Sequence, residues 1–193
     1  MATCAYLLHE GSSTLLMAKS KLPSIKDNPT TPKLEMNALT MTARLSNTIF
    51  SALRNRVLIK KITIYSDSEI ALGWIKNPKL DAKVGVLVRN RSKEVRKIVA
   101  SLQKDGITVK FRYVDTTSNP ADAATRGLSK QKFNDHLLWW NGPAYLRLPK
   151  QDWSPQEELS LQEAEEPLVQ TILSTSTAQA VYSGDWPRHS SVY

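Results

Sequence analysis

The sequence predicts an α/β fold in which a mixed β-sheet is flanked by helices. Strand-like runs, rich in apolar and β-branched residues, recur at 5–8, 14–18, 57–65 and 108–114. Helical patterns at 34–55, 68–75 and 84–104 lie between the later runs. Strands and helices in this order favour a sheet with helices packed against it.

The first two strands, Ala5–Leu8 and Thr14–Ala18, are predicted to form a hairpin around the turn at Glu10–Ser13. A Pro- and Lys-bearing connection follows at 21–33. From Leu34 onward, apolar residues recur at intervals of three and four, which predicts a helix that ends near Asn55.

The strand at Val57–Tyr65 leads directly into Ser66-Asp67-Ser68 and a short helix at Ser68–Ile75, which Asn77-Pro78 ends. A longer helix is expected from Val84 to Lys104. Its predicted core stripe is Val95, Ile98, Val99 and Leu102. After the strand at Thr108–Val114, Asn119 is placed to cap a short helix that begins at Pro120 and ends before Gly127.

The charge of the chain divides it into two parts. Residues 1–150 hold 25 Lys and Arg against 11 Asp and Glu, a net charge of +14. Residues 151–193 hold one Arg against seven acids, a net charge of −6, and are rich in Ser and Thr. We therefore expect one basic domain at 1–150 and an acidic tail at 151–193. Little fixed structure is expected in that tail beyond a helix near Gln156–Glu165.

Several classes of protein are excluded or disfavoured by composition. Apolar runs of about 20 residues, which a membrane span requires, are absent, and no signal peptide is recognisable at the start. The single cysteine, Cys4, excludes an internal disulfide framework and cysteine-based zinc sites. We expect an intracellular protein, cytoplasmic or nuclear, with no membrane partner.

Three acids occupy positions that favour a common site. Glu35 lies at the start of the long helix, Asp67 ends a strand, and Asp122 lies in the short helix capped by Asn119. Each has a local explanation, because acids are common in helix first turns and caps. Together, inside a basic domain, they indicate a divalent-metal site that faces a phosphate backbone.

Two other features leave alternatives open. The residues Arg89, Lys93, Arg96 and Lys97 fall on the face of the long helix opposite its core stripe. They form either a solvated helix face or a surface that contacts a nucleic-acid backbone. The pair Trp139-Trp140 is either a core anchor or a platform for base stacking.

The motifs around these acids resemble the ribonuclease H superfamily, and more closely the ribonuclease H domain of Pao/BEL-type retrotransposon polyproteins. The resemblance covers about residues 4–153. It rests on Lys19-Ser20-Lys21, Pro32-Lys33-Leu34-Glu35, Ser66-Asp67-Ser68-Glu69, Val88-Arg89-Asn90-Arg91, Asn119-Pro120-Ala121-Asp122 with Arg126-Gly127, and Leu138-Trp139-Trp140-Asn141-Gly142-Pro143.

The resemblance implies that Glu35, Asp67 and Asp122 are catalytic metal ligands for Mg²⁺ or Mn²⁺. The implied reaction is two-metal hydrolysis of the RNA strand of an RNA–DNA hybrid by water. The implied partners are nucleic acid, as this hybrid or another duplex, and other parts of a retroelement polyprotein. Oligomeric state is not predicted.

One departure from the family pattern concerns the first acid. In the family it lies in an Asp-Ala-Ser-like turn a few residues before an Ala-Tyr pair, which Ala5-Tyr6 resembles here, yet no Asp or Glu precedes Glu10. We expect a domain truncated at its N-terminus, with impaired hydrolysis. The alternative is a non-catalytic retroelement remnant that keeps the fold and nucleic-acid binding.

Overall fold

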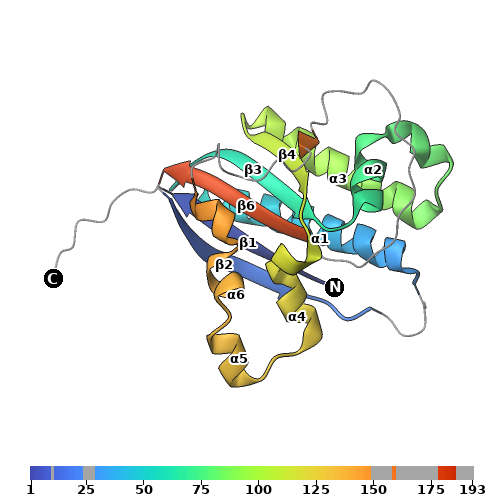
Figure 1. Cartoon of the computed structure of the whole chain (residues 1–193). Coiled ribbons are helices and arrows are strands. Elements are labelled where there is room, and N and C mark those ends of the chain that lie inside the picture. Colours follow the sequence, from blue (N-terminus) through green and yellow to red (C-terminus); the bar gives the residue numbers. More distant parts are fainter. Residues whose placement is uncertain (10, 24–28, 149–157, 160–177, 186–193) are drawn as a thin grey trace.

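The computed structural model describes residues 1–9, 11–23, 29–148, 158–159 and 178–185. Six strands form one sheet in the order β2-β1-β6-β3-β4-β5 (Figure 1). The sheet is mixed, because β3 pairs in parallel with β4 and β1 with β6, whereas the other three pairings are antiparallel. The strands are β1 (Ala2–His9), β2 (Ser12–Ser20), β3 (Leu58–Ser66), β4 (Thr108–Tyr113), β5 (Glu158–Leu159) and β6 (Ala178–Asp185).

Helices lie on both faces of this sheet (Figure 1). The helices α1 (Thr31–Leu53), α2 (Glu69–Lys76) and α3 (Val86–Lys104) share one apolar cluster with β3 and β4. The other face carries α4 (Ala123–Arg126), α5 (Lys130–Asn134) and α6 (Leu137–Asn141). The predicted mixed sheet flanked by helices is therefore confirmed.

Alternation along the strands assigns side chains to the two faces. Ile62 and Ile64 of β3 join the cluster with the long helices, whereas Tyr65 packs with Val114 and Leu146 on the opposite face. The same period of two in β1 sends Ala5 to the first face and Tyr6 to the second. The hydroxyl of Tyr6 donates to the carbonyl of Trp139 at 2.6 Å, which fastens α6 to the sheet.

The predicted helices occur close to their expected limits. Of the predicted core stripe of α3, Val95, Val99 and Leu102 are buried and Ile98 is half-buried. The segment predicted from Pro120 to Gly127 is a 3₁₀ helix, η4 (Pro120–Asp122), that continues into α4. Asn119 caps it through a hydrogen bond from the backbone N–H of Ala121. Gly127 ends it with a φ of 66°, a value that glycine adopts without a Cβ clash.

Two strands lie in the segment that we expected to have little fixed structure. Glu158–Leu159, inside the expected helix near Gln156–Glu165, is the short edge strand β5. Ala178–Asp185 is β6, a central strand that pairs with both β1 and β3. Pairing on two sides stabilises a strand whatever its local composition, so local sequence gave little sign of it. The rest of 151–193 lies outside the described residues.

We predict that a proline in β6 will destabilise the whole domain. Val181 pairs with Tyr6 on one side and Thr63 on the other. Proline there removes a backbone donor from a central strand, so Val181→Pro should lower the free energy of unfolding by about 3 kcal/mol, as measured by urea denaturation. The matched control, Leu159→Pro in the edge strand, should cost far less. Equal stability of Val181→Pro and the wild type would contradict the central position of β6.

Candidate metal and nucleic-acid site

Glu35 lies in the second turn of α1 and is 2% exposed. Its Oε2 atom accepts a hydrogen bond of 2.5 Å from the hydroxyl of Ser68. Its Oε1 atom is also buried and has no hydrogen-bond partner within the part of the chain that the structure describes. Burial raises the pKa of the Glu35 carboxyl, and the bond from Ser68 lowers it in part. Glu35 therefore has one carboxylate oxygen fixed by hydrogen bonding and one that is buried without a partner among the described residues.

Asp67 follows the last residue of β3 and is 4% exposed. The neighbouring serines define its turn, because the backbone N–H of Ser68 donates to the hydroxyl oxygen of Ser66 at 3.2 Å. Ser68 also caps α2 by accepting from the N–H of Ala71 at 3.1 Å. Since Ser68 also bonds to Glu35, the structure brings Glu35 and the turn of Asp67 together.

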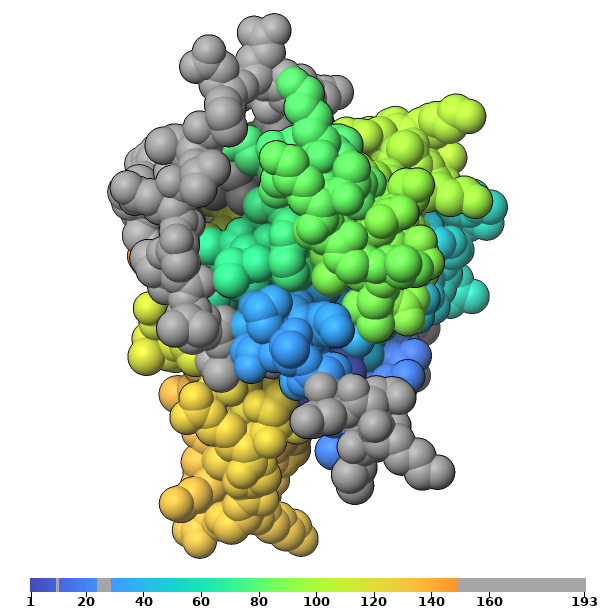
Figure 2. Space-filling model, turned by 90° about the vertical axis from the view of Figure 1, so that its right-hand side faces the viewer, coloured from blue at the N-terminus to red at the C-terminus, as the bar shows by residue number. Residues whose placement is uncertain are grey.

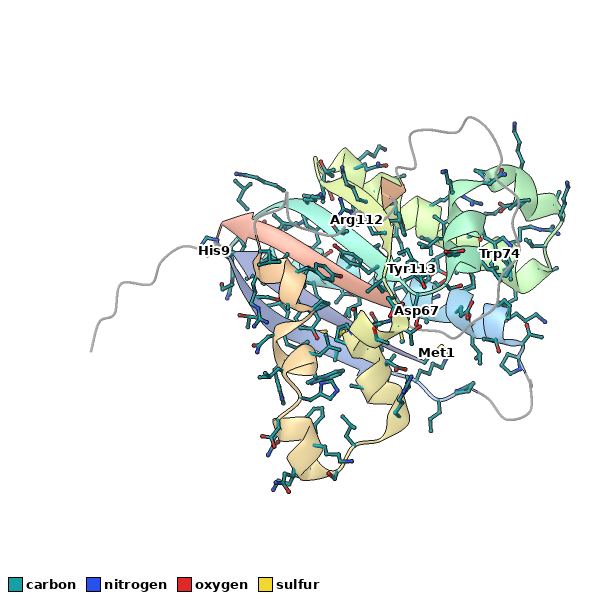
Figure 3. The ribbon with its side chains drawn as sticks, in the orientation of Figure 1. Met1, His9, Asp67, Trp74, Arg112 and Tyr113 are labelled. Carbon is teal, nitrogen blue, oxygen red and sulfur yellow. The ribbon has the colours of Figure 1, made fainter. Side chains whose placement is uncertain are left out.

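The surroundings of Asp67 are acidic. Asp67 and Tyr113 lie at the same end of the sheet, where β3 and β4 finish (Figure 3). Burial raises the pKa of the Tyr113 hydroxyl, and the nearby charges of Asp115, Glu69 and Asp67 raise it further. An end of the sheet that gathers negative charge attracts cations.

Asp122 is in η4, which packs against β1 and β6. One carboxylate oxygen of Asp122 forms an ion pair of 2.6 Å with Arg126, one helical turn later, and the other lies 3.3 Å from the hydroxyl of Thr125. Asp122 is thus engaged within its own helix. In the conformation described, nothing comparable to the Ser68 bond joins it to Glu35.

Figure 2 shows the face of the molecule that lies on the right in Figure 1. There the blue start of α1 lies between the green region of α2 and α3 and the yellow segment that follows η4. Thr3 of β1 and Ser66 of β3 both pair with Ala178, so the start of β1 lies at the same end of the sheet as the end of β3. Met1, which directly precedes Ala2, therefore lies at the same end of the sheet as Asp67 (Figure 3).

The fit of this set to a divalent cation is partial. Mg²⁺ prefers oxygen ligands, and the buried, unpartnered Oε1 of Glu35 beside the Asp67 turn matches that preference. The complete set does not match. Among residues 1–9, 11–23, 29–148, 158–159 and 178–185, no group of three or more His, Cys, Asp or Glu side chains could hold a metal ion. The metal roles of Glu35, Asp67 and Asp122 stay predictions.

The four basic residues predicted to contact nucleic acid fall into two pairs. Lys93 and Lys97 are exposed on α3. Arg96 instead forms an ion pair with Asp81 and donates to the carbonyl of Trp74, and Arg89 donates to the carbonyl of Asp81. These arginines fasten α3 to the end of α2 and to the 3₁₀ helix η2 (Pro78–Ala82). Contact with nucleic acid stays a prediction, and the lysines are the better placed to make it.

The side chains of Trp139 and Trp140 have different environments. Trp139 is buried and packs with Cys4, Tyr6 and Ala121, as expected of a core anchor. Trp140 is 40% exposed, and its indole N–H donates to the carbonyl of Phe133 at 3.0 Å. The core-anchor interpretation therefore describes only the first of the two.

Sequence reasoning missed the role of Ser68. Its position directly after a strand and three residues before Ala71 indicates a helix cap, but a single sequence does not show that the same hydroxyl reaches Glu35. It also missed Glu94, which bonds both Arg44 of α1 and Arg91 of α3 and so joins the two long helices.

Comparison with known proteins supports the resemblance for the first part of the chain. Residues 1–68 match a sequence model described as the Pao retrotransposon-like RNaseH-like domain. This region contains β1, β2, α1 and β3 and ends at Asp67-Ser68, so it includes Glu35 and Asp67 but not Asp122. No curated protein and no solved structure matches the chain significantly. No helix of the described residues is long and apolar enough to span a membrane.

We predict that Arg96 contributes to stability and that Lys97 does not. Replacing Arg96 by Met leaves the partly buried Asp81 without its ion pair and removes the donor to the carbonyl of Trp74. The free energy of unfolding should therefore fall by about 2 kcal/mol. Replacing the exposed Lys97 by Ala should change stability by less than about 0.5 kcal/mol. Urea unfolding of both variants measures this difference, and similar values would refute the structural role of Arg96.

A second prediction concerns pH. Because burial raises the pKa of Glu35 above its ordinary value of 4.5, the folded state binds more protons than the unfolded state above that pH. The contribution of Glu35 to stability should therefore decrease as pH rises from about 4.5, and level off above its folded-state pKa. Glu35→Gln lacks this titration. When the free energy of unfolding of both proteins is measured from pH 4 to about 8, the wild type should lose stability relative to the variant as the pH rises. A constant difference would contradict the buried carboxyl.

Proposed function

We propose that this chain is a ribonuclease H-like domain of retrotransposon type that binds RNA–DNA hybrid and hydrolyses its RNA strand poorly. The observation that carries the proposal is the buried carboxylate of Glu35. Its Oε1 has no partner among the described residues, and its Oε2 accepts a hydrogen bond from Ser68, which belongs to the turn of Asp67. Both acids lie within the region that matches the Pao retrotransposon-like RNaseH-like domain. Other parts of a retroelement polyprotein are its proposed partners, inside the cell.

The residues have separate roles in this proposal. Glu35 and Asp67 would hold a divalent cation, Mg²⁺ or Mn²⁺, and Asp122 would join them when its carboxylate leaves Arg126. When bound, such ions supply an activated water and relieve charge on the leaving oxygen. The bond from Ser68 restricts the Glu35 carboxylate, and the bond between Ser68 and Ser66 fixes the backbone turn that carries Asp67. Selectivity for the RNA strand would come from its 2′-hydroxyl groups and groove shape.

The proposed impairment has two supports. The chain contains no Asp or Glu ahead of Glu10, where the family pattern has its first acid. In addition, Asp122 is paired with Arg126 rather than with the other two acids. The same observations favour the second candidate function, a non-catalytic domain that keeps only nucleic-acid binding.

Nucleic-acid binding is supported by charge. The part of the chain up to residue 150 carries a net +14. Besides Lys93 and Lys97, exposed lysines occur at the end of α2 and around η2, at Lys76, Lys79 and Lys83. Because Arg89 and Arg96 fasten this region to α3, its lysines are presented on a fixed support. Such a surface contacts phosphates without reading base sequence.

We predict that the lysines of α3 contribute to the salt dependence of binding. Each phosphate contact contributes about −0.9 to the slope of log K against log salt for B-form duplex, so Lys93→Ala with Lys97→Ala should flatten the slope on hybrid duplex by about one to two units. Fluorescence anisotropy across a salt series measures the slope. The control pair, Lys130→Ala with Lys132→Ala, removes two exposed lysines of α5. Equal flattening in both pairs would show general charge attraction rather than a defined surface.

We also predict that one added acid will increase hydrolysis. A short segment with an Asp-Ala-Ser-like turn, placed so that the Asp lies just ahead of Ala2, puts a carboxylate at the same end of the sheet as Asp67. Mg²⁺-dependent cleavage of the RNA strand should increase at least about tenfold, which corresponds to about 1.4 kcal/mol of transition-state stabilisation. Asn in place of the added Asp, or Asp67→Asn in the same chain, should remove the gain.

The outcomes of that experiment separate the two functions. A gain that depends on both the added Asp and Asp67 supports an impaired nuclease. Efficient cleavage by the unmodified chain would show that another acid supplies the missing ligand, with Glu10 and Glu69 the candidates nearest in sequence. Hybrid binding without cleavage by any of these chains would favour the non-catalytic domain.

A further inference from the structure

Ser68 makes more contacts to the candidate site than any role as a helix cap requires. Its side chain is 2% exposed. Its hydroxyl accepts from the N–H of Ala71 and lies 2.5 Å from Oε2 of Glu35, and its own N–H donates to the hydroxyl oxygen of Ser66. It therefore links β3, α2 and α1 at one point.

The direction of the hydrogen bond to Glu35 follows from the chemistry of the groups. The backbone N–H of Ala71 is a donor, so it uses a lone pair of the Ser68 oxygen and leaves the hydroxyl proton for another acceptor. An ionised carboxylate can only accept. The proton of Ser68 thus points to Glu35, in a charge-assisted bond that is stronger than one between neutral groups.

We propose that Ser68 is a positioning residue that orients the Glu35 carboxylate as a single-oxygen ligand for a divalent cation. With Oε2 held by the hydroxyl, rotation of the carboxylate is restricted, and the unpartnered Oε1 is the atom that a cation would contact. Through its backbone bond to Ser66, the same residue fixes the turn that carries Asp67. This inference rests on the proposed cation site at Glu35 and Asp67.

The competing interpretation is that Ser68 only caps α2. The two interpretations differ for glycine, which is nearly as good as serine at an N-cap although it has no hydroxyl. Alanine lacks the hydroxyl and is also a poor cap. If Ser68 only caps the helix, Ser68→Gly should behave like the wild type and Ser68→Ala should not. If it positions Glu35, both variants should lose cation affinity to a similar extent.

The experiment measures Mn²⁺ affinity by water-proton relaxation for the full-length wild type, Ser68→Gly, Ser68→Ala and Ser68→Thr. Only the component of binding that Glu35→Gln removes is counted, because acids elsewhere in the chain also attract cations. The structural control is Ser129→Ala, which removes the cap of α5 through its bond to Lys132, on the sheet face opposite α1. The ¹³Cδ resonance of Glu35, recorded without metal at a fixed pH, reports the hydrogen bond directly.

We expect Ser68→Gly and Ser68→Ala to weaken Mn²⁺ binding about tenfold and to shift the Glu35 resonance, since loss of an outer-shell partner of a ligand has effects of this size. Ser68→Thr keeps the hydroxyl and should bind Mn²⁺ more tightly than Ser68→Gly and Ser68→Ala. Ser129→Ala should change neither readout. Wild-type affinity and an unshifted resonance in Ser68→Gly would overturn the positioning role while leaving the cation site in place. Absence of the Glu35-dependent component in the wild type would overturn the cation site itself, and the ligand-positioning role with it.

Discussion

The hydrogen bond from Ser68 to Glu35 joins the two elements on which the candidate site depends. It connects the start of α1 with the turn between β3 and α2, and it is buried from solvent. A buried carboxylate with one unpartnered oxygen is unfavourable by itself, as the raised pKa of Glu35 shows. Carboxylates with a perturbed pKa are often found at functional sites. The free-energy cost of burying Glu35 therefore connects the fold with the proposed function.

The sheet shows where local sequence patterns are sufficient and where they are not. The hairpin of β1 and β2, the helices α1 and α3, and the strands β3 and β4 were predictable because each has a strong apolar period. The short helical segment of η4 and α4 was predictable from its end signals, Asn119 and Gly127. The strand β6 was not predictable, because its place between β1 and β3 is decided by pairing with residues more than 100 positions away.

The same distinction holds for the site. The positions of Glu35 near the start of α1 and of Asp67 directly after β3 could be predicted from sequence, as could an exposed Lys93 and Lys97 on the outer face of α3. Sequence could not show that Arg96 is held by Asp81 or that Arg126 engages Asp122, because helical periodicity gives the direction of a side chain but not its partner. Charge alone therefore does not show that Arg96 and Arg126 have acidic partners within the chain.

The most direct test of this account is to map bound Mn²⁺ on the amide spectrum of the ¹⁵N-labelled protein. Paramagnetic broadening acts over short distances, so it locates the cation without any assumption about activity. The account predicts that low Mn²⁺ concentrations will first broaden the amides near Glu35 and those of Ser66, Asp67 and Ser68, and that Glu35→Gln will abolish this effect. Broadening that begins elsewhere in the chain, or that is unchanged in Glu35→Gln, would contradict it.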